Sequence, residues 1–385
     1  MNRCEAAPIT WKGRRAFRLT NGTVEITVLL GGGHIADFRL CGSPYNTLFE
    51  SPWSTIEPSQ FSSQLHSSSY GDGPIGRLLC GYTGHALALG YFGLPDESES
   101  NQGLPLHGEA VASDWKISYS NADDVSASVT MEALLPVYGL RAERTLLLSA
   151  GASTVHIEER VTNVKHSPLD FQWVEHAAFG EPLFSAGEAK LYLSANQCRT
   201  WPLGYEDRES LVVDRDFDWP HAPWIKGHLV DLSLPFDKNG TGFVAALLTE
   251  PERSNAYIAV HNRRLELAAG YVFDRCQFPW IALWEENCAR SYPPWNGVTR
   301  ARGVEFGNSP IPLGLQHAKE MKTLFDVPVF STIQAGETIA TSYQIFVTPM
   351  ERDWPDISDL REESGSLAVH SQDGRLASIP TSGKP

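Results

Sequence analysis

The stretch VEITVLLGGG at residues 24–33 alternates apolar side chains with others and then ends in three glycines. Val24, Ile26 and Val28 would lie on one face of a β-strand, because successive side chains of a strand point to opposite faces. The three glycines interrupt this run and indicate a turn. No helical pattern follows them, so they do not predict a phosphate-binding loop. The stretch therefore predicts a strand that ends at residue 30.

The same strand pattern recurs along most of the chain. Further candidates span residues 34–40, 115–120, 125–135, 140–149, 155–163, 189–194, 242–248, 256–261, 280–284 and 338–347. Many short strands separated by Gly, Pro and Asn predict an all-β sandwich or barrel. A parallel α/β fold would need helices of about 10–15 residues between its strands. The sequence offers only short helix candidates, at 312–322 and 358–363.

The domain organisation follows from length and composition. A folded chain of 385 residues can bury roughly three quarters of its unfolded surface, which is enough for a core without metals or disulfide bonds. No linker with a different composition separates two parts of the chain before residue 350. We therefore predict a single domain at 1–350. Residues 351–385 are polar, and we expect a partly disordered C-terminal tail there.

Charge and motif content exclude several classes of protein. The formal net charge is −15, from 46 acidic and 31 basic residues, which disfavours nucleic acid as a partner. No segment has the apolar length of a membrane span or of a signal peptide, so we expect a cytoplasmic protein with no membrane partner. The six cysteines lack CxxC spacing and are expected to be free thiols. Motifs typical of metal or nucleotide binding are also absent, so no metal and no cofactor are predicted.

Three short segments contain candidates for acid–base chemistry. His107 in LPLHGE lies between a proline and a glycine, and His176 in FQWVEHAAFG ends a strand-like run. Glu305 in RGVEFG is flanked by apolar residues, and the resulting loss of solvation would raise its pKa. Each residue alone also has a purely structural interpretation. His107 could cap a turn, His176 could be an ordinary strand end, and Glu305 could face solvent from a half-buried strand.

Taken together and in this order, the three segments resemble the aldose 1-epimerase (galactose mutarotase-like) family. That family has a His-Gly pair in the first half, a second His at a strand end, and a Glu after a glycine near the C-terminus. His107, His176 and Glu305 match these positions, and the resemblance covers roughly residues 15–350. The segment FPWIALW at 278–284 also looks like the aromatic strand that precedes the family's glutamate.

The resemblance implies a β-supersandwich of mostly antiparallel strands with an open cleft on one sheet. It implies an isomerase that interconverts the anomers of a sugar by general acid–base catalysis without a cofactor. Glu305 would be the base, His176 would be the acid at the ring oxygen, and His107 would assist. The partner would be a small-molecule sugar, bound by a monomer or a homodimer.

Candidate substrate-binding residues are two arginines and two tryptophans. Arg77 and Arg302 could bind hydroxyl groups or an anionic group of the sugar. Trp280 or Trp284 could stack on the apolar face of a pyranose, although core packing is an equal expectation for one of them. The chain departs from well-known mutarotases after the second histidine, where it has two alanines at 177–178.

Two other functions remain open at the level of sequence. The same cleft could support a lyase or an isomerase that acts on a keto or uronic sugar by removing a proton next to a carbonyl. Alternatively, the protein could be a non-catalytic carbohydrate-binding protein. A lyase would create an unsaturated product that absorbs ultraviolet light, and the sugar affinity of a binding protein would survive the loss of His176 and Glu305.

Overall fold

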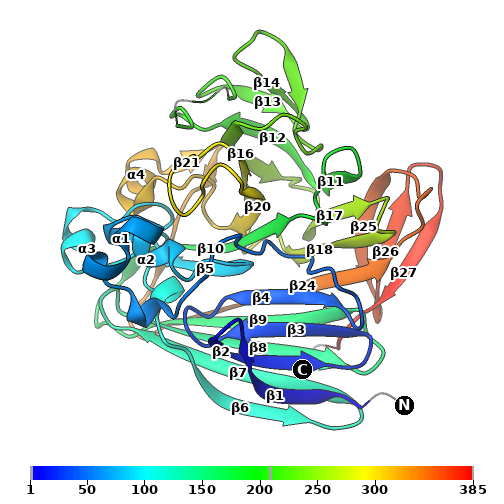
Figure 1. The fold of residues 1–385 in the computed structure, drawn as a ribbon, viewed down its shortest axis with the longest axis horizontal. Coiled ribbons are helices and arrows are strands. Elements are labelled where there is room, and N and C mark those ends of the chain that lie inside the picture. The colour runs from blue at the N-terminus through cyan, green and yellow to red at the C-terminus, as the bar shows by residue number, and fades with distance from the viewer. Residues whose placement is uncertain (1–2, 207, 209, 384–385) are drawn as a thin grey trace.

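The computed structural model describes residues 3–206, 208 and 210–383. Within them, two antiparallel sheets of twelve and eight strands form the body of the molecule (Figure 1). In spatial order the larger sheet contains β1 (Glu5–Trp11), β2 (Arg14–Thr20), β3 (Val24–Leu29), β4 (Ile35–Leu40), β5 (His85–Gly90), β10 (Leu169–Gly180), β20 (Arg300–Gly307), β19 (Trp280–Asn287), β16 (Thr241–Thr249), β12 (Ala195–Thr200) and β13 (Asp216–Asp218), and β23 (Ser331–Ile333) pairs with β10. The smaller sheet contains β11 (Ala189–Leu193), β17 (Asn255–Asn262), β18 (Leu267–Asp274), β24 (Thr338–Pro349), β9 (Thr154–Asn163), β8 (Leu140–Ser149), β7 (Ser126–Leu135) and β6 (Lys116–Ala122). The predicted all-β class of mostly antiparallel strands is confirmed.

The core lies between these two sheets and follows the period-2 pattern of their strands. In β7, residues 127, 129, 131, 133 and 135 are buried, and in β8 residues 140, 142, 144, 146 and 148 are buried. Apart from Arg144, their side chains meet those of the inner face of the larger sheet in one large apolar cluster. The segment at 24–33 forms β3 and a turn, as its sequence predicts.

Short helices and loops cover the outer face of the larger sheet. They include α1 (Ser63–Tyr70), α2 (Gly73–Leu79), α3 (Glu97–Asn101), α4 (Gly314–Met321) and the 3₁₀ turns η1 (Pro58–Gln60) and η2 (Ala110–Ala112). The hairpin of β21 (Thr323–Leu324) and β22 (Val327–Pro328) packs near Trp280 on this side, whereas the hairpin of β14 (His221–Pro223) and β15 (Leu229–Asp231) contributes Ala222 to the main apolar cluster of the core. Among the described residues, no helix is long and apolar enough to cross a membrane. The predicted helix at 312–322 corresponds to α4.

The C-terminal segment differs from its prediction. In place of a partly disordered tail and a helix at 358–363, the structure has a three-stranded antiparallel sheet of β25 (Ile357–Glu363), β26 (Ser366–Ser371) and β27 (Leu376–Pro380). Leu367 and Ile379 are buried in a cluster with Phe346 of β24. A few apolar residues at alternating positions are therefore enough to dock an otherwise polar segment on the outer face of the smaller sheet.

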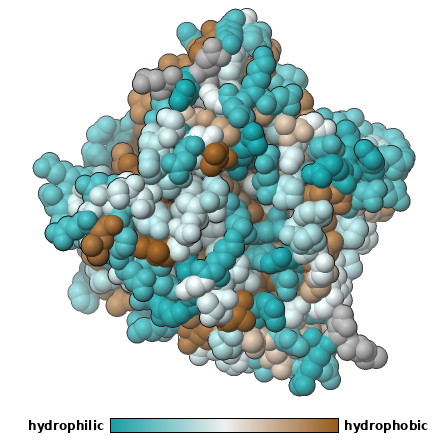
Figure 2. Space-filling view, in the orientation of Figure 1, coloured by the Kyte–Doolittle hydropathy of each residue, from teal (hydrophilic) through white to brown (hydrophobic). Residues whose placement is uncertain are grey.

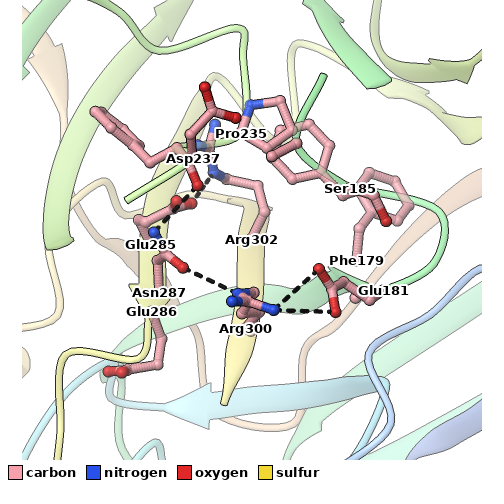
Figure 3. A pocket seen from close by; sticks show the side chains of 15 residues that line it. Phe179, Glu181, Ser185, Pro235, Asp237, Glu285, Glu286, Asn287, Arg300 and Arg302 are labelled. Carbon is pink, nitrogen blue, oxygen red and sulfur yellow. Dashed lines mark hydrogen bonds and ion pairs between the residues drawn. The ribbon is translucent and has the colours of Figure 1, made fainter. Parts of the chain in front are cut away.

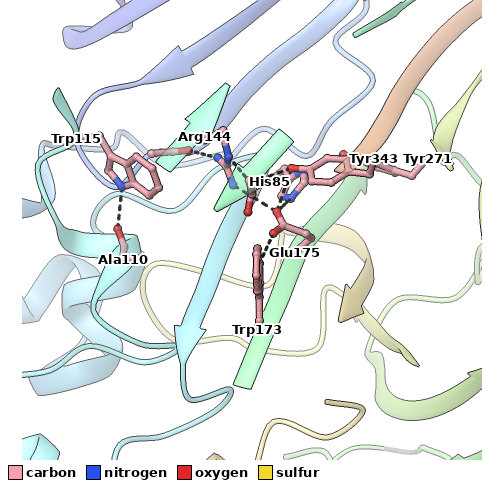
Figure 4. A network of polar contacts seen from close by, with 10 residues as sticks. His85, Ala110, Trp115, Arg144, Trp173, Glu175, Tyr271 and Tyr343 are labelled. Carbon is pink, nitrogen blue, oxygen red and sulfur yellow. Dashed lines mark hydrogen bonds and ion pairs between the residues drawn. The ribbon is translucent and has the colours of Figure 1, made fainter. Parts of the chain in front are cut away.

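A polar network crosses the core between the two sheets (Figure 4). Arg144 of β8 donates hydrogen bonds to Glu159 of β9 at 2.5 Å and to Glu175 of β10 at 3.3 Å. Glu175 also lies 2.8 Å from the His85 Nε2 atom and accepts a hydrogen bond from the Tyr343 hydroxyl at 3.0 Å. Each of these five side chains is buried. The network thus joins the two sheets directly behind the strand that carries His176.

Candidate functional site

A cavity of about 350 Å³ opens on the outer face of the larger sheet. Its floor is formed by neighbouring strands β10, β20, β19 and β16, and its walls come from α2 and from loops that follow α2, β5, α3, β12, β19 and β20. A volume of this size falls within the range that small-molecule ligands occupy, about 300–1,000 Å³. The lining includes His107, His176 and Glu305, so the structure brings together the three residues that the sequence singled out.

His176 and Glu305 face each other across the floor. They lie on the adjacent antiparallel strands β10 and β20, and both side chains point away from the core. The His176 Nε2 atom is 3.3 Å from the Glu305 Oε1 atom. The exposed fraction is 6% for His176 and 3% for Glu305, so the pair is almost free of solvent.

The glycine before the glutamate gives the carboxyl group its space. A Cβ atom at Gly303 would lie 2.4 Å from Glu305 Oε1 and 3.0 Å from the Trp284 Cβ atom. Gly303 and Glu305 share one face of β20, because they are two residues apart in a strand. Any larger residue at 303 would displace the carboxyl group or the indole ring of Trp284.

His107 approaches His176 from the loop between α3 and η2. The centroids of the two imidazole rings are 4.7 Å apart. The backbone of His107 is in the left-handed region, with φ 69°, and its N–H donates to the Gly93 carbonyl at 2.9 Å. Gly93 N–H in turn donates to the His107 Nδ1 atom at 3.1 Å. Because Nδ1 accepts this bond, the neutral ring carries its proton on Nε2, where it can serve as a donor.

Tyr82 completes the surroundings of His176. Its hydroxyl lies 3.3 Å from the His176 Nδ1 atom, so both ring nitrogens of His176 have a polar neighbour. Burial, together with the nearby Glu305 carboxyl, raises the pKa of Tyr82 well above its ordinary value. The hydroxyl therefore keeps its proton at neutral pH and helps to fix the orientation of the imidazole ring.

Burial shifts the pKa values of Glu305 and His176 in opposite directions. It raises the pKa of Glu305 well above its ordinary value and lowers the pKa of His176 to about 4. It also lowers the pKa of His107 well below its ordinary value, with a smaller effect from His176. In the absence of a ligand, these directions favour a protonated Glu305 beside a neutral His176, an arrangement in which the pair holds one proton.

One wall of the cavity is built from aromatic rings and an arginine. Trp284 of β19 donates its indole N–H to the Tyr205 hydroxyl at 2.9 Å, and that hydroxyl donates to Glu286 at 2.9 Å. The Arg290 guanidinium lies 4.9 Å from the ring centroid of Tyr205 and 4.7 Å from that of Trp295. This arrangement holds the Trp284 ring rigidly at the cavity, 6.3 Å from the His176 ring.

Of the four predicted substrate-binding residues, Trp284 lines the cavity and the other three do not. Trp280 is fully buried and donates its indole N–H to the Pro328 carbonyl at 2.8 Å. It lies four residues before Trp284 on β19, about 13 Å along the strand, and packs under the segment that follows β20. Arg77 turns away from the cavity, because its guanidinium donates to the Gly103 carbonyl at 2.6 Å.

Arg302 faces the opposite side of β20 from Glu305. It is fully buried and donates to Glu285 at 2.6 Å and to the Leu232 carbonyl at 2.5 Å. Figure 3 shows it in a second, smaller cavity of about 210 Å³, above Arg300 and its partner Glu181. Residues three apart in a strand point to opposite faces, so Arg302 cannot reach the cavity that contains His176.

Sequence reasoning missed several residues of the site. Tyr82, Tyr205, Arg290 and Trp295 line the cavity, but they come from loops, where no periodic pattern marks a side chain that faces a ligand. Glu286 could have been found, because it is two residues after Trp284 and must share its face of β19. Within the described part of the chain, no group of three or more His, Cys, Asp or Glu side chains is placed to hold a metal ion.

The fold is similar to those of several solved structures. A proposed aldose 1-epimerase from Klebsiella pneumoniae matches with a TM-score of 0.61 and 15% identity, over 89% of this chain and 82% of that chain. A galactose mutarotase-like protein from Clostridium acetobutylicum matches with a TM-score of 0.58 and 12% identity, over 91% of this chain and 100% of that chain. No protein-family model and no curated protein matches the sequence.

These likenesses define the class of fold. The chain has the galactose mutarotase-like β-sandwich, and it resembles aldose 1-epimerase-like proteins in the arrangement of its two sheets. At 12–15% identity, similarity of this kind shows the fold alone. The reaction therefore depends on the groups that the site itself contains.

Proposed function

We propose that this protein is an isomerase that acts at the anomeric centre of a sugar and interconverts its two anomers. The observation that carries the proposal is the contact between the almost fully buried His176 and Glu305 at the floor of the cavity, with His107 beside them. Interconversion needs one group that takes a proton from the anomeric hydroxyl and one that gives a proton to the ring oxygen. Glu305 is proposed as the first group and His176 as the second.

The proton balance of this pair suits the reaction. Ring opening requires a Glu305 carboxylate and a protonated His176. Burial favours the other arrangement, a protonated Glu305 and a neutral His176, which holds the same number of protons. Transfer of one proton from Glu305 to His176, over 3.3 Å, converts this arrangement into the reactive one. The opening step then moves a proton from the sugar to Glu305 and another from His176 to the ring oxygen. It leaves the pair in the form that the empty cavity favours.

The second half of the reaction runs the same steps in reverse. The open-chain aldehyde rotates about the C1–C2 bond and presents its other face to the ring hydroxyl. His176 takes the proton from that hydroxyl, and Glu305 returns a proton to the aldehyde oxygen as the ring closes. The pair ends with the proton arrangement with which it began, so no cofactor or other reagent is consumed.

His107 and Trp284 are proposed to position the sugar. The Nε2–H group of His107 is a donor beside His176, and it would bind the ring oxygen or an adjacent hydroxyl group. The Trp284 ring is held in place through Tyr205 and offers an apolar surface to the C–H groups of a pyranose. Together they would keep C1 and the ring oxygen over the pair.

Proton NMR tests this proposal directly. The anomeric signals of freshly dissolved α-glucose, α-galactose and several deoxy and uronic sugars would be followed with and without the purified protein. We expect at least one of these sugars to equilibrate faster than its spontaneous rate. If every sugar that binds equilibrates at its spontaneous rate, the proposed reaction is wrong.

A further inference from the structure

The cavity separates polar from apolar groups by depth. Its floor has Glu305, His176 and His107, whereas much of its wall is aliphatic. The aliphatic lining residues come from α2, from β16 and from several loops, and they are Ile75, Leu78, Leu79, Leu94, Leu106, Leu203, Val244, Pro312 and Leu313. A bare sugar presents hydroxyl groups in every equatorial direction, and such a wall leaves most of them without a partner.

Apolar side chains also surround the entrance. Ile75, Leu94 and Leu203 line the cavity and are 43%, 53% and 54% exposed. They come from α2, from the loop after β5 and from the loop after β12. Figure 2 shows hydrophobic residues exposed on the side of the molecule where Figure 1 draws α1–α3. Exposed apolar residues that cluster at the mouth of a cavity typically mark a surface that a ligand covers.

The charges at the cavity disfavour an anionic substrate. Among the described lining residues, Arg290 is the one Arg or Lys side chain. Its guanidinium is 3.0 Å from Glu206 Oε1 and 3.7 Å from Glu286 Oε2, and it is stacked between two aromatic rings. Its charge is therefore already balanced, and a carboxylate or phosphate on the ligand would meet Glu206 without a free cation.

We propose that the substrate is a neutral sugar that carries an apolar substituent on the side of the ring away from the anomeric carbon. The inference rests on the proposed function, because catalysis fixes which end of the sugar lies deep. If C1 and the ring oxygen lie over His176 and Glu305, then the far side of the ring faces the aliphatic wall and the entrance. An alkyl, acyl or aryl group there would cover Leu94 and Leu203 and be removed from water.

The probe for this inference is 3-O-benzyl-glucose, which has a free anomeric hydroxyl and an apolar group on the opposite side of the ring. Its affinity and that of glucose would be measured by the fluorescence of the tryptophans that line the cavity. We expect 3-O-benzyl-glucose to bind at least about tenfold more tightly than glucose, because burial of a phenyl group from water is strongly favourable. Equal affinities for the two sugars would overturn the inference.

Variants at the cavity entrance test whether its apolar side chains cause the preference for 3-O-benzyl-glucose over glucose. The double variant Leu94→Ser/Leu203→Ser changes two exposed side chains, so it should fold normally. It is expected to reduce the ratio of the two affinities by about threefold or more. The control is Leu376→Ser, since Leu376 is 61% exposed on β27 and does not line the cavity. A preference that survives the double variant would also contradict the inference.

The same samples separate this inference from the proposed reaction. Anomer exchange of both sugars would be measured by NMR beside their affinities. Tight binding of 3-O-benzyl-glucose without faster exchange would reject the isomerase and leave an amphipathic carbohydrate-binding site. Equal affinities with faster exchange would keep the isomerase and reject the apolar substituent. If neither sugar binds, the apolar substituent is rejected, whereas the isomerase is judged on the other sugars of the NMR series.

Discussion

At the scale of residues, the site depends on the environment of two ordinary side chains. A glutamate and a histidine in water would both be charged or partly charged near neutral pH. In this cavity, burial raises the pKa of Glu305 and lowers that of His176, so that they hold a single proton between them. A pair of this kind has an acid and a base available at the same time, which is what reversible opening of a sugar ring requires.

The pH dependence of the reaction follows from this pair. When the pH falls through about 4, His176 becomes protonated while Glu305 is still protonated, and no base remains. We therefore expect kcat to fall below about pH 4 and to stay level above it until Glu305 loses its proton. Loss of activity on the alkaline side would follow the raised pKa of Glu305. A rate that instead falls from pH 7 to pH 5 would show that the active form does not contain this proton arrangement.

The residues that sequence reasoning found are those with a distinctive neighbourhood in the chain. His107 and His176 each stand beside glycine or alanine, Glu305 is flanked by apolar residues, and their order resembles a known family. Arg302 shows the limit of that resemblance, because the alternation of a strand places it on the face opposite Glu305. Arg290 could not be predicted, since only the folded loop brings it to the cavity.

At the scale of elements, strand β10 contributes to the cavity with one face and to the polar network of the core with the other. His176 points to the cavity, and its neighbour Glu175 points to the core, where it meets Arg144 and His85. Burial raises the pKa of Glu159, the other carboxyl group near Arg144, to about 8. The Arg144 guanidinium is the positive charge beside the carboxyl groups of Glu159 and Glu175 in this region of the core.

Replacement of Arg144 by methionine tests this interpretation. The variant leaves Glu159 and Glu175 buried without their cation, and we expect unfolding free energy to fall by about 3–5 kcal/mol. Urea denaturation followed by tryptophan fluorescence would measure the change. The matched control is Arg160→Met on the neighbouring strand, whose side chain is 52% exposed and pairs with Glu158. That change should cost less than about 1 kcal/mol, and similar losses in both variants would contradict a special role for Arg144.

At the scale of the whole molecule, the fold could be predicted in class but not in detail. Alternating strands such as β3 and β7 are visible in the sequence because each has one face in the core. Strands β16 to β19 are buried along most of their length, on both faces, so their sequences are apolar without strict alternation. The C-terminal sheet was not foreseen, because its few buried residues are separated by polar ones.

The role of that sheet in the fold can be measured. We predict that it unfolds together with the rest of the molecule, because Leu367 packs in one cluster with Phe346 of β24. Leu367→Ala should then lower the global free energy of unfolding by about 2–5 kcal/mol, the usual effect of removing a buried leucine side chain. If the variant instead makes residues 357–380 sensitive to protease and leaves the urea midpoint unchanged, the sheet is an independent unit.

The central claim is that Glu305, together with His176, interconverts sugar anomers, and the most direct measurement compares wild type with Glu305→Gln. The amide has nearly the shape of the carboxyl group but cannot take up the proton of the anomeric hydroxyl. We expect the NMR rate of anomer exchange, with the sugar that wild type turns over, to fall by about 10²–10⁴-fold. Glu143→Gln is the control and should exchange at the wild-type rate, because this side chain lies on β8, is 40% exposed and does not line the cavity.

The stability of the same variant separates a chemical effect from misfolding. The pKa of Glu305 is raised in the folded state, so its contribution to stability is present at low pH and is lost as the pH rises. Glutamine avoids that loss, and the variant should be at least as stable as wild type at pH 8. A folded, stable Glu305→Gln protein with a greatly reduced exchange rate is the predicted result. An unchanged exchange rate in that protein would contradict the account.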